Sequence, residues 1–379
     1  MPTLPCLGRG IEDHSRMYYT SDTHVMLKRI KKVLAGINKN QAFAVVAIVS
    51  FLVGGLLAGS LVAYIFMQQP VSTARPLRQS DIPSAQSDYH FIDPLIALRG
   101  TITSSKYDPM KMQVSDYIAD QNKNGLISAT VYYRDIKEQG GFVLNPTVLY
   151  TPASLYKVPV MMVYYKIAER DSSILEDRIT YGGEEDHNSV EEIKSAIQLV
   201  PGRTYTVEQL IEHMIRYSDN NALHLLTDHL KDTNNLAEYA TVFNDLGINL
   251  ATLSEYTDNV TAQQYSIFIR ALYNATYLSR EHSEQAMKLL SETDFSEGIE
   301  SGVPNDILVA QKFGEVRMTD SLGTLLGKQL NNCGVVYYPE HPYMLCIMTK
   351  KTGDDVKSIE NIVSTISRIV YKNTQVLYP

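Results

Sequence analysis

A serine and a lysine three residues apart could carry nucleophilic chemistry, namely Ser154 and Lys157. A serine hydroxyl is a weak nucleophile, and a nearby lysine amine with a lowered pKa can accept its proton. Thr151 and Pro152 are typical of a helix start, which would place both side chains on one helix face. Alone, this spacing is more often a solvated surface pair. Pro159 also conflicts with a helix that starts at Pro152, because a later proline costs a backbone hydrogen bond.

Two further segments carry polar groups suited to the same chemistry. In Ser218-Asp219-Asn220, the hydroxyl could pass a proton to a leaving nitrogen and the Asn side chain could bind a substrate amide. The alternative is an ordinary turn at a helix junction, which these residue types favour. In the segment 312–314, Lys312 could attract an anionic substrate, and Gly314 on a strand lets a ligand backbone come close.

Strand patterns occur at both ends of the region that follows residue 90. The β-rich runs 126–135 and 142–150 are separated by Gly140 and Gly141, which predicts a hairpin. Three more strands are expected at 303–313, 332–338 and 343–350. Strands from both ends of the chain could therefore join one antiparallel sheet.

Helical periodicity dominates the stretch between these strands. Thr206 and Gln209 form a capping-box pattern that opens one helix. Further helices are expected at 261–274 and 282–290, and an amphipathic helix at 355–371 closes the chain. The order predicts an α+β fold: a five-stranded antiparallel sheet with flanking helices, plus a mainly helical subdomain.

Taken together and in this order, the three polar segments match SxxK, SDN and KTG. This set resembles the motifs of class A β-lactamases and penicillin-binding proteins. The similarity extends to flanking stretches such as PGRTYTVEQLIEHMIRYSDNNALHLL and SGVPNDILVAQKFG, and it covers about residues 110–372. The resemblance implies a serine hydrolase with a β-lactamase-like fold that needs no metal and no organic cofactor.

The resemblance also implies a role for each matching residue. Ser154 would be the acylated nucleophile, Lys157 its base or proton relay, and Ser218 the carrier of a proton to the leaving nitrogen. The remaining matches would bind the substrate or its oxyanion: Asn220 at the side-chain amide, Lys312 at the carboxylate with Phe313 and Gly314 beside it in the substrate site, and the backbone N–H of Ser154 with that of Glu315 or Val316 at the oxyanion.

Two departures from the family pattern concern turnover. Class A enzymes carry a Glu on a long omega loop that activates the deacylating water. Here the matching stretch, 247–258, is short, and Glu255 is the carboxylate in it that could substitute; the alternative is a solvated loop residue. Phe313 replaces a Thr that helps bind the β-lactam carboxylate. Three functions therefore stay open: a working β-lactamase, a slowly deacylating penicillin-binding or D,D-peptidase-like protein, and a catalytically silent cell-envelope binding domain.

A long apolar segment predicts the location of the chain. Residues 42–67 carry no charge, and as a helix of roughly 39 Å they would cross a hydrocarbon core of about 30 Å. A buried core helix and a cleaved signal peptide are the alternatives. Five basic residues at 28–39 precede the segment, and only Arg75 and Arg78 closely follow it, so the positive-inside rule puts the N-terminus in the cytoplasm.

The predicted organisation has four parts. A cytoplasmic tail, 1–41, precedes the transmembrane helix, 42–67, and a Pro/Ser-rich tether, 68–89, leads to a catalytic domain outside the membrane, 90–379. Gly55 and Gly59 form a GxxxG pattern that could support a weak homodimer. The expected partners are thus the membrane, a second copy and a β-lactam or peptidoglycan-derived substrate.

Composition excludes several other classes. Apolar residues make up 44% of the 379, which excludes a disordered chain, and a net charge of -8 argues against nucleic-acid binding. Three cysteines exclude a disulfide-built scaffold; Cys333 and Cys346 would face each other across the last hairpin, either as a disulfide or as two buried thiols. The histidines show no metal spacing. One group of carboxylates is interpreted as a solvated surface: Glu184, Glu185, Asp186, Glu191 and Glu192.

Overall fold

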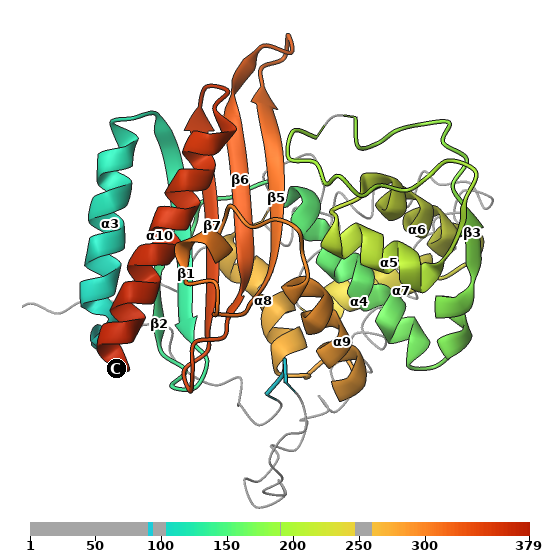
Figure 1. Cartoon of the computed structure of the whole chain (residues 1–379), viewed down its shortest axis with the longest axis horizontal. Coiled ribbons are helices and arrows are strands. Elements are labelled where there is room, and N and C mark those ends of the chain that lie inside the picture. Colours follow the sequence, from blue (N-terminus) through green and yellow to red (C-terminus); the bar gives the residue numbers. More distant parts are fainter. Residues whose placement is uncertain (1–89, 94–103, 190, 247–259) are drawn as a thin grey trace, which may run out of the picture. The chain divides into compact units, whose positions relative to one another are not determined.

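A mixed architecture of sheet and helices is seen in the computed structural model of the chain (Figure 1). The structure describes residues 90–93, 104–189, 191–246 and 260–379, all within one compact unit, Pro83–Pro379. The predicted tail, transmembrane segment and tether, with Gly55 and Gly59, lie outside the described residues, as does Glu255. Within the described ranges, no helix has the length and apolar character needed to cross a membrane.

The five-stranded sheet is antiparallel throughout and runs in the order β2-β1-β7-β6-β5. The first strand of the chain pairs with the last, so the prediction that both ends of the domain join one sheet is confirmed. The strands are β1 (Leu126–Asp135), β2 (Gly141–Leu144), β5 (Val309–Thr319), β6 (Leu325–Val336) and β7 (Tyr343–Thr352).

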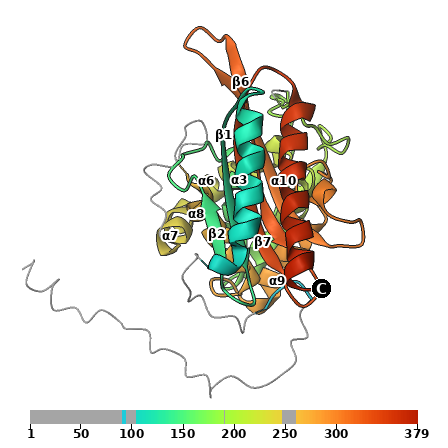
Figure 2. The same ribbon diagram turned by 90° about the vertical axis from the view of Figure 1, so that its left-hand side faces the viewer.

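Helices cover both faces of this sheet. The helices α3 (Asp108–Asn122) and α10 (Val356–Leu377) lie side by side on one face, as Figure 2 shows, and α8 (Ala262–Tyr273) contacts the strands from the other. Side chains alternate along a strand. Accordingly, Val131 of β1 packs in the cluster under α3 and α10, whereas Tyr132 packs in the cluster shared with the helical part.

The remaining helices gather beside edge strand β5, in the right half of Figure 1. Their centre is α4, of whose twelve residues eleven are buried, as expected for a helix that is apolar all round. The predicted capping box of Thr206 and Gln209 is confirmed at the start of α5. The group comprises α4 (Lys157–Ala168), α5 (Val207–Arg216), α6 (Asn220–Asp232), α7 (Leu236–Asp245) and α9 (Arg280–Ser291), with a ribbon of β3 (Arg178–Thr180) and β4 (Thr204–Thr206).

Several boundaries differ from the sequence prediction. The strand β2 ends at Leu144, β5 begins at Val309 and extends past Phe313, and β6 begins at Leu325, seven residues before the predicted start. Of the residues added to β5, 315–319 are partly or fully exposed, whereas those added to β6 are buried from Gly327 onward although several of them are polar. Cys333 and Cys346 lie opposite each other on β6 and β7 and form a disulfide, which decides between the two alternatives for this pair.

Candidate active site

Ser154 lies in a short 3-10 turn, η3 (Ala153–Tyr156), that leads directly into α4. The helix thus begins at Lys157 and not at Pro152, which corrects the predicted start. Pro159 is then the third helical residue, where a backbone N–H has no partner inside the helix, so the predicted conflict disappears.

Ser154 and Lys157 are in direct contact. The Nζ atom of Lys157 lies 2.9 Å from the Oγ atom of Ser154, because residues three apart eclipse each other in a 3-10 turn. The lysine is fully buried, whereas Ser154 is only partly buried and can meet a substrate. The residue before the serine, Ala153, has a φ of 51°, a strained value that is common where a backbone is bent for function.

Ser218 reaches the same lysine from the junction between α5 and α6. Its Oγ atom lies 3.1 Å from Lys157 Nζ, and its backbone carbonyl also accepts a hydrogen bond from Lys157 Nζ. Ser218 is buried and has a φ of 54°, which a non-glycine residue adopts only under constraint. The predicted turn is therefore present, and it places the Ser218 side chain in the site.

The two residues after Ser218 fix this junction. The Asp219 carboxylate caps α6 at the N–H groups of Asn221 and Ala222 and also accepts from Leu199. Burial opposes its ionisation, but these bonds and that from His213 hold the pKa of Asp219 below its usual value. Asn220 is only partly buried, and its side-chain amide donates to the carbonyl of His187 at 3.2 Å.

The edge strand β5 supplies the second buried lysine. Lys312 is 1% exposed, and its Nζ atom lies 2.9 Å from Ser218 Oγ and 3.1 Å from the carbonyl of Phe313. Burial, with repulsion from the nearby Lys157 ammonium, holds the pKa of Lys312 well below that of a solvated lysine. One serine hydroxyl thus bridges two lysines.

Gly314 lets β5 approach the serine turn. A Cβ atom there would lie 2.9 Å from the backbone N of Ser154 and 2.9 Å from the carbonyl of Pro152, which is too close for any side chain. The turn is also held from β6, because the side chains of Gln329 and Asn331 donate to the carbonyl of Thr151. The predicted close approach at this glycine is therefore made to the protein's own serine turn.

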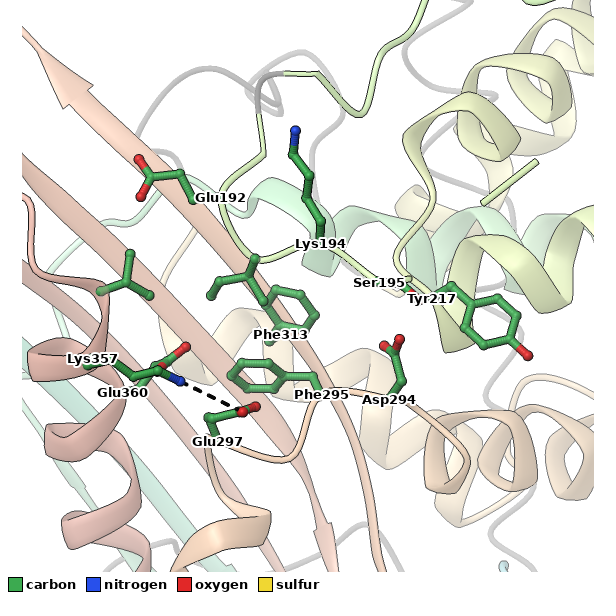
Figure 3. A pocket seen from close by; sticks show the side chains of 12 residues that line it. Glu192, Lys194, Ser195, Tyr217, Asp294, Phe295, Glu297, Phe313, Lys357 and Glu360 are labelled. Atoms are coloured by element: carbon green, nitrogen blue, oxygen red, sulfur yellow. Dashed lines mark ion pairs between the residues drawn. The ribbon is translucent and has the colours of Figure 1, made fainter. Parts of the chain in front are cut away.

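A cavity of about 430 Å³ opens on the other side of β5 (Figure 3). Phe313 lines it and stacks on Phe295, with ring centroids 4.1 Å apart. Tyr217, next to Ser218, and Ile193 also contribute to its wall. A Phe at this position presents an apolar ring where the family's Thr would present a hydroxyl.

The interpretation of Glu191 as solvated is wrong. The Glu191 side chain is 14% exposed and its Oε1 atom lies 3.7 Å from Lys157 Nζ. Glu192 is exposed, as interpreted, although its carboxylate pairs with Arg317 and Lys328 of the sheet. Nothing in the local sequence separates Glu191 from the exposed carboxylates beside it, because its partner lies far along the chain.

The Glu315 side chain makes a contact that the sequence did not predict. Its side chain accepts the backbone N–H groups of Glu192 and Ile193, at 2.6 and 2.8 Å. Burial raises the pKa of this carboxyl group.

Hydrogen bonds connect four of the predicted site residues directly, namely Ser154, Lys157, Ser218 and Lys312. Gly314 lies against the serine turn.

Metal ligation has no support in the described ranges, where no three His, Cys, Asp or Glu residues are placed to hold an ion. The groups that are present are hydroxyls and amines in contact. Such a chain of donors and acceptors can move a proton from Ser154 through Lys157 and Ser218, which is the requirement for an activated serine nucleophile.

Comparison with solved structures shows the fold. "Structure of PBP-A" matches with 18% identity and a TM-score of 0.57, over 71% of this chain and 96% of that one. A β-lactamase from Sphaerobacter thermophilus matches with 22% identity and a TM-score of 0.57, over 70% and 98%. A representative class A β-lactamase from Bacteroides cellulosilyticus has 17% identity and a TM-score of 0.57, over 70% and 99%.

Sequence comparison identifies the family. No curated protein sequence matches this chain. The model of the β-lactamase enzyme family matches residues 109–374, which is most of the chain and includes every residue of the site described above. The motifs, the fold and this match agree, and the chain belongs to the β-lactamase enzyme family of serine hydrolases.

Proposed function

We propose that this chain is a serine hydrolase that forms an acyl-enzyme on Ser154 with β-lactams or peptidoglycan-like amides. The observation that carries the proposal is the contact of Lys157 Nζ with both Ser154 Oγ and Ser218 Oγ. A buried amine between two hydroxyls can take a proton from one and return it through the other.

The proposed acylation step conserves atoms and protons. Ser154 Oγ attacks the amide carbonyl carbon, and its proton passes to the neutral amine of Lys157. The C–N bond then breaks, and the proton reaches the leaving nitrogen through the Ser218 hydroxyl. The backbone N–H groups of Ser154 and of Glu315 or Val316 would stabilise the oxyanion, and the close approach of β5 to Ser154 N at Gly314 supports this role.

Substrate binding is proposed for the groups around this relay. Asn220 would bind the substrate side-chain amide, and Lys312 would attract the substrate carboxylate. Phe313 cannot donate a hydrogen bond to that carboxylate, so the proposal favours weak binding of small β-lactams. The fate of the acyl-enzyme separates two forms of the proposal, a β-lactamase that deacylates quickly and a penicillin-binding protein that deacylates slowly.

The proposed location is the cell membrane, with a cytoplasmic N-terminus and the catalytic domain outside. This proposal rests on the apolar segment 42–67 and the basic residues before it. The Cys333–Cys346 disulfide supports it, because disulfides persist in oxidising compartments.

A labelling experiment with the full-length chain in detergent tests the proposal. Fluorescent penicillin is expected to label wild type covalently and to leave Ser154→Ala unlabelled. Loss of β-lactam absorbance without a lasting adduct would identify a β-lactamase, and a lasting adduct a penicillin-binding protein. Absence of both signals at high penicillin concentration would refute the β-lactam part of the proposal and favour another acyl substrate or a silent binding domain.

A further inference from the structure

A buried carboxylate lies beside the proposed catalytic lysine. Glu191 belongs to the segment between α4 and α5, and its Oε1 atom is 3.7 Å from Lys157 Nζ. The side-chain amide of Asn220 also interacts with this carboxylate. Burial raises the pKa of Glu191, although the two nearby lysines, Lys157 and Lys312, oppose that rise.

The sheet fixes the backbone that follows Glu191. Glu315 of β5 accepts the N–H groups of Glu192 and Ile193. The carboxylate of Glu192 pairs with Arg317 of β5 at 2.9 Å and with Lys328 of β6. Two strands thus hold the residues next to Glu191, which is what a group needs if it must act at a defined distance from Ser154.

Glu191 and Ser154 both lie beside the same lysine nitrogen. Lys157 Nζ lies 3.7 Å from Glu191 Oε1 and 2.9 Å from Ser154 Oγ, so those two oxygens are at most 6.6 Å apart, the sum of the two distances. Two oxygens that share one bridging water are up to roughly 6 Å apart. This upper limit places the carboxylate near the reach of a water that also contacts an ester on Ser154.

Resting on the proposed function, we infer that Glu191 is the general base that activates the water for hydrolysis of the acyl ester on Ser154. The water oxygen bonds to the ester carbonyl carbon, and its proton passes to the Glu191 carboxylate. The bond from carbon to Ser154 Oγ breaks, and the proton held by Glu191 passes through the Lys157 amine to that oxygen. Ser154, Lys157 and Glu191 are then in their starting protonation states, and water is the only reactant consumed.

The burial of Glu191 suits this role. A general base works best when its pKa is near the working pH, and the pKa of this carboxyl group is raised from its usual value. The resemblance to the family had placed the role in the segment that contains Glu255. Glu191 would bring a carboxylate to the same chemistry from a different part of the chain.

Four variants of the full-length chain in detergent test the inference: wild type, Glu191→Gln, Glu255→Gln and Glu185→Gln. Glu185 is the matched control, because it belongs to the same run of carboxylates and its side chain is 80% exposed. Each protein is labelled with fluorescent penicillin to measure acylation. Unlabelled penicillin is then added, and the loss of label gives the deacylation rate across a pH series.

We expect Glu191→Gln to acylate within about tenfold of wild type and to deacylate roughly 10²-fold or more slowly. The variant lacks the carboxyl group that titrates, so its deacylation rate should no longer fall at low pH as the wild-type rate does. A purely structural effect would not remove this pH dependence. Glu185→Gln should match wild type in both steps.

Other outcomes would overturn the inference in distinguishable ways. Wild-type deacylation by Glu191→Gln would refute it and leave the proposed function intact, and slow deacylation by Glu255→Gln alone would assign the base to Glu255. An equal loss of both steps in Glu191→Gln would indicate that the residue only positions Lys157. Failure of wild type to acylate would refute the proposed function, and this inference with it.

Discussion

Two buried lysines of the same sheet meet opposite electrostatic surroundings. Lys312 of β5 is 1% exposed and faces another lysine, Lys157, so burial and repulsion lower its pKa. Lys328 of β6 is 5% exposed, but it pairs with Asp354 and Glu192, and those bonds outweigh burial and raise its pKa. The surroundings of Lys312 thus suit proton transfer, and those of Lys328 suit the anchoring of a loop through ion pairs.

The difference teaches that direct contact with a carboxylate decides the pKa of a buried lysine. Lys312 contacts a serine hydroxyl and a backbone carbonyl, and the charges of Glu191 and Asp294 do not offset its burial and the repulsion from Lys157. Lys328 forms ion pairs with the carboxylates of Glu192 and Asp354, although Glu192 also pairs with Arg317. Four substitutions can break or sharpen this comparison.

The largest effect is expected from Lys157→Met, which removes the amine but keeps the apolar stem. Loss of a positioned proton acceptor should lower the acylation rate by about 10²–10⁴-fold. Fluorescent penicillin labelling over time measures it. Labelling at the wild-type rate would show that the contact with Ser154 is not catalytic.

Gly314→Ala should have the next largest effect on acylation. The added Cβ would meet the backbone at Ser154 and Pro152, at 2.9 Å from each, so β5 must move away from the serine turn. A displacement of about 1 Å in an active site can cost roughly 10²-fold in rate. The labelling rate gives the result, circular dichroism melting shows whether the fold is kept, and an unchanged rate would mean that this strand does not position the nucleophile.

Lys312→Met should lower acylation by about tenfold while raising stability at neutral pH. Its pKa is lowered in the folded protein, so between that value and about 10.4 the unfolded chain binds more protons and wild-type stability increases with pH. The variant lacks this slope, and its advantage in Tm should therefore shrink from pH 7 to pH 10. A Tm difference that is constant with pH would contradict the lowered pKa.

The smallest effect on acylation, within about threefold, is expected from Lys328→Met. This change leaves Glu192 and Asp354 without their shared ammonium group, at a cost of about 1–2 kcal/mol in the free energy of unfolding. That cost corresponds to a fall in Tm of about 3–5 °C. If Lys328→Met lowered the acylation rate as much as Lys157→Met does, the proposed difference in role between the site lysines and Lys328 would be wrong.

The sequence predicted the fold well where the pattern is local. The β-rich run 126–135 gave β1 its bounds, and the pair of Thr206 and Gln209 gave the start of α5. The helix α3 escaped prediction although Met110, Val114 and Ile118 recur every four residues, because the polar residues between them mask the pattern.

The sequence predicted those site residues that belong to the three motifs. The residues Ser154, Lys157, Ser218 and Lys312 come together as the family resemblance implies. The positions of Glu191 and Glu315 could not be predicted, because a carboxylate next to Lys157 or under a loop depends on contacts between distant segments. Glu255 stays a prediction.

The most direct test of the account is to locate the acyl group on the chain. The full-length protein is incubated with penicillin, digested and analysed by tandem mass spectrometry, with Ser154→Ala as the control. We expect the mass of one intact penicillin on the peptide that contains Ser154 and no adduct in the variant. An adduct on another residue that persists in Ser154→Ala would contradict the assignment of Ser154 as the nucleophile.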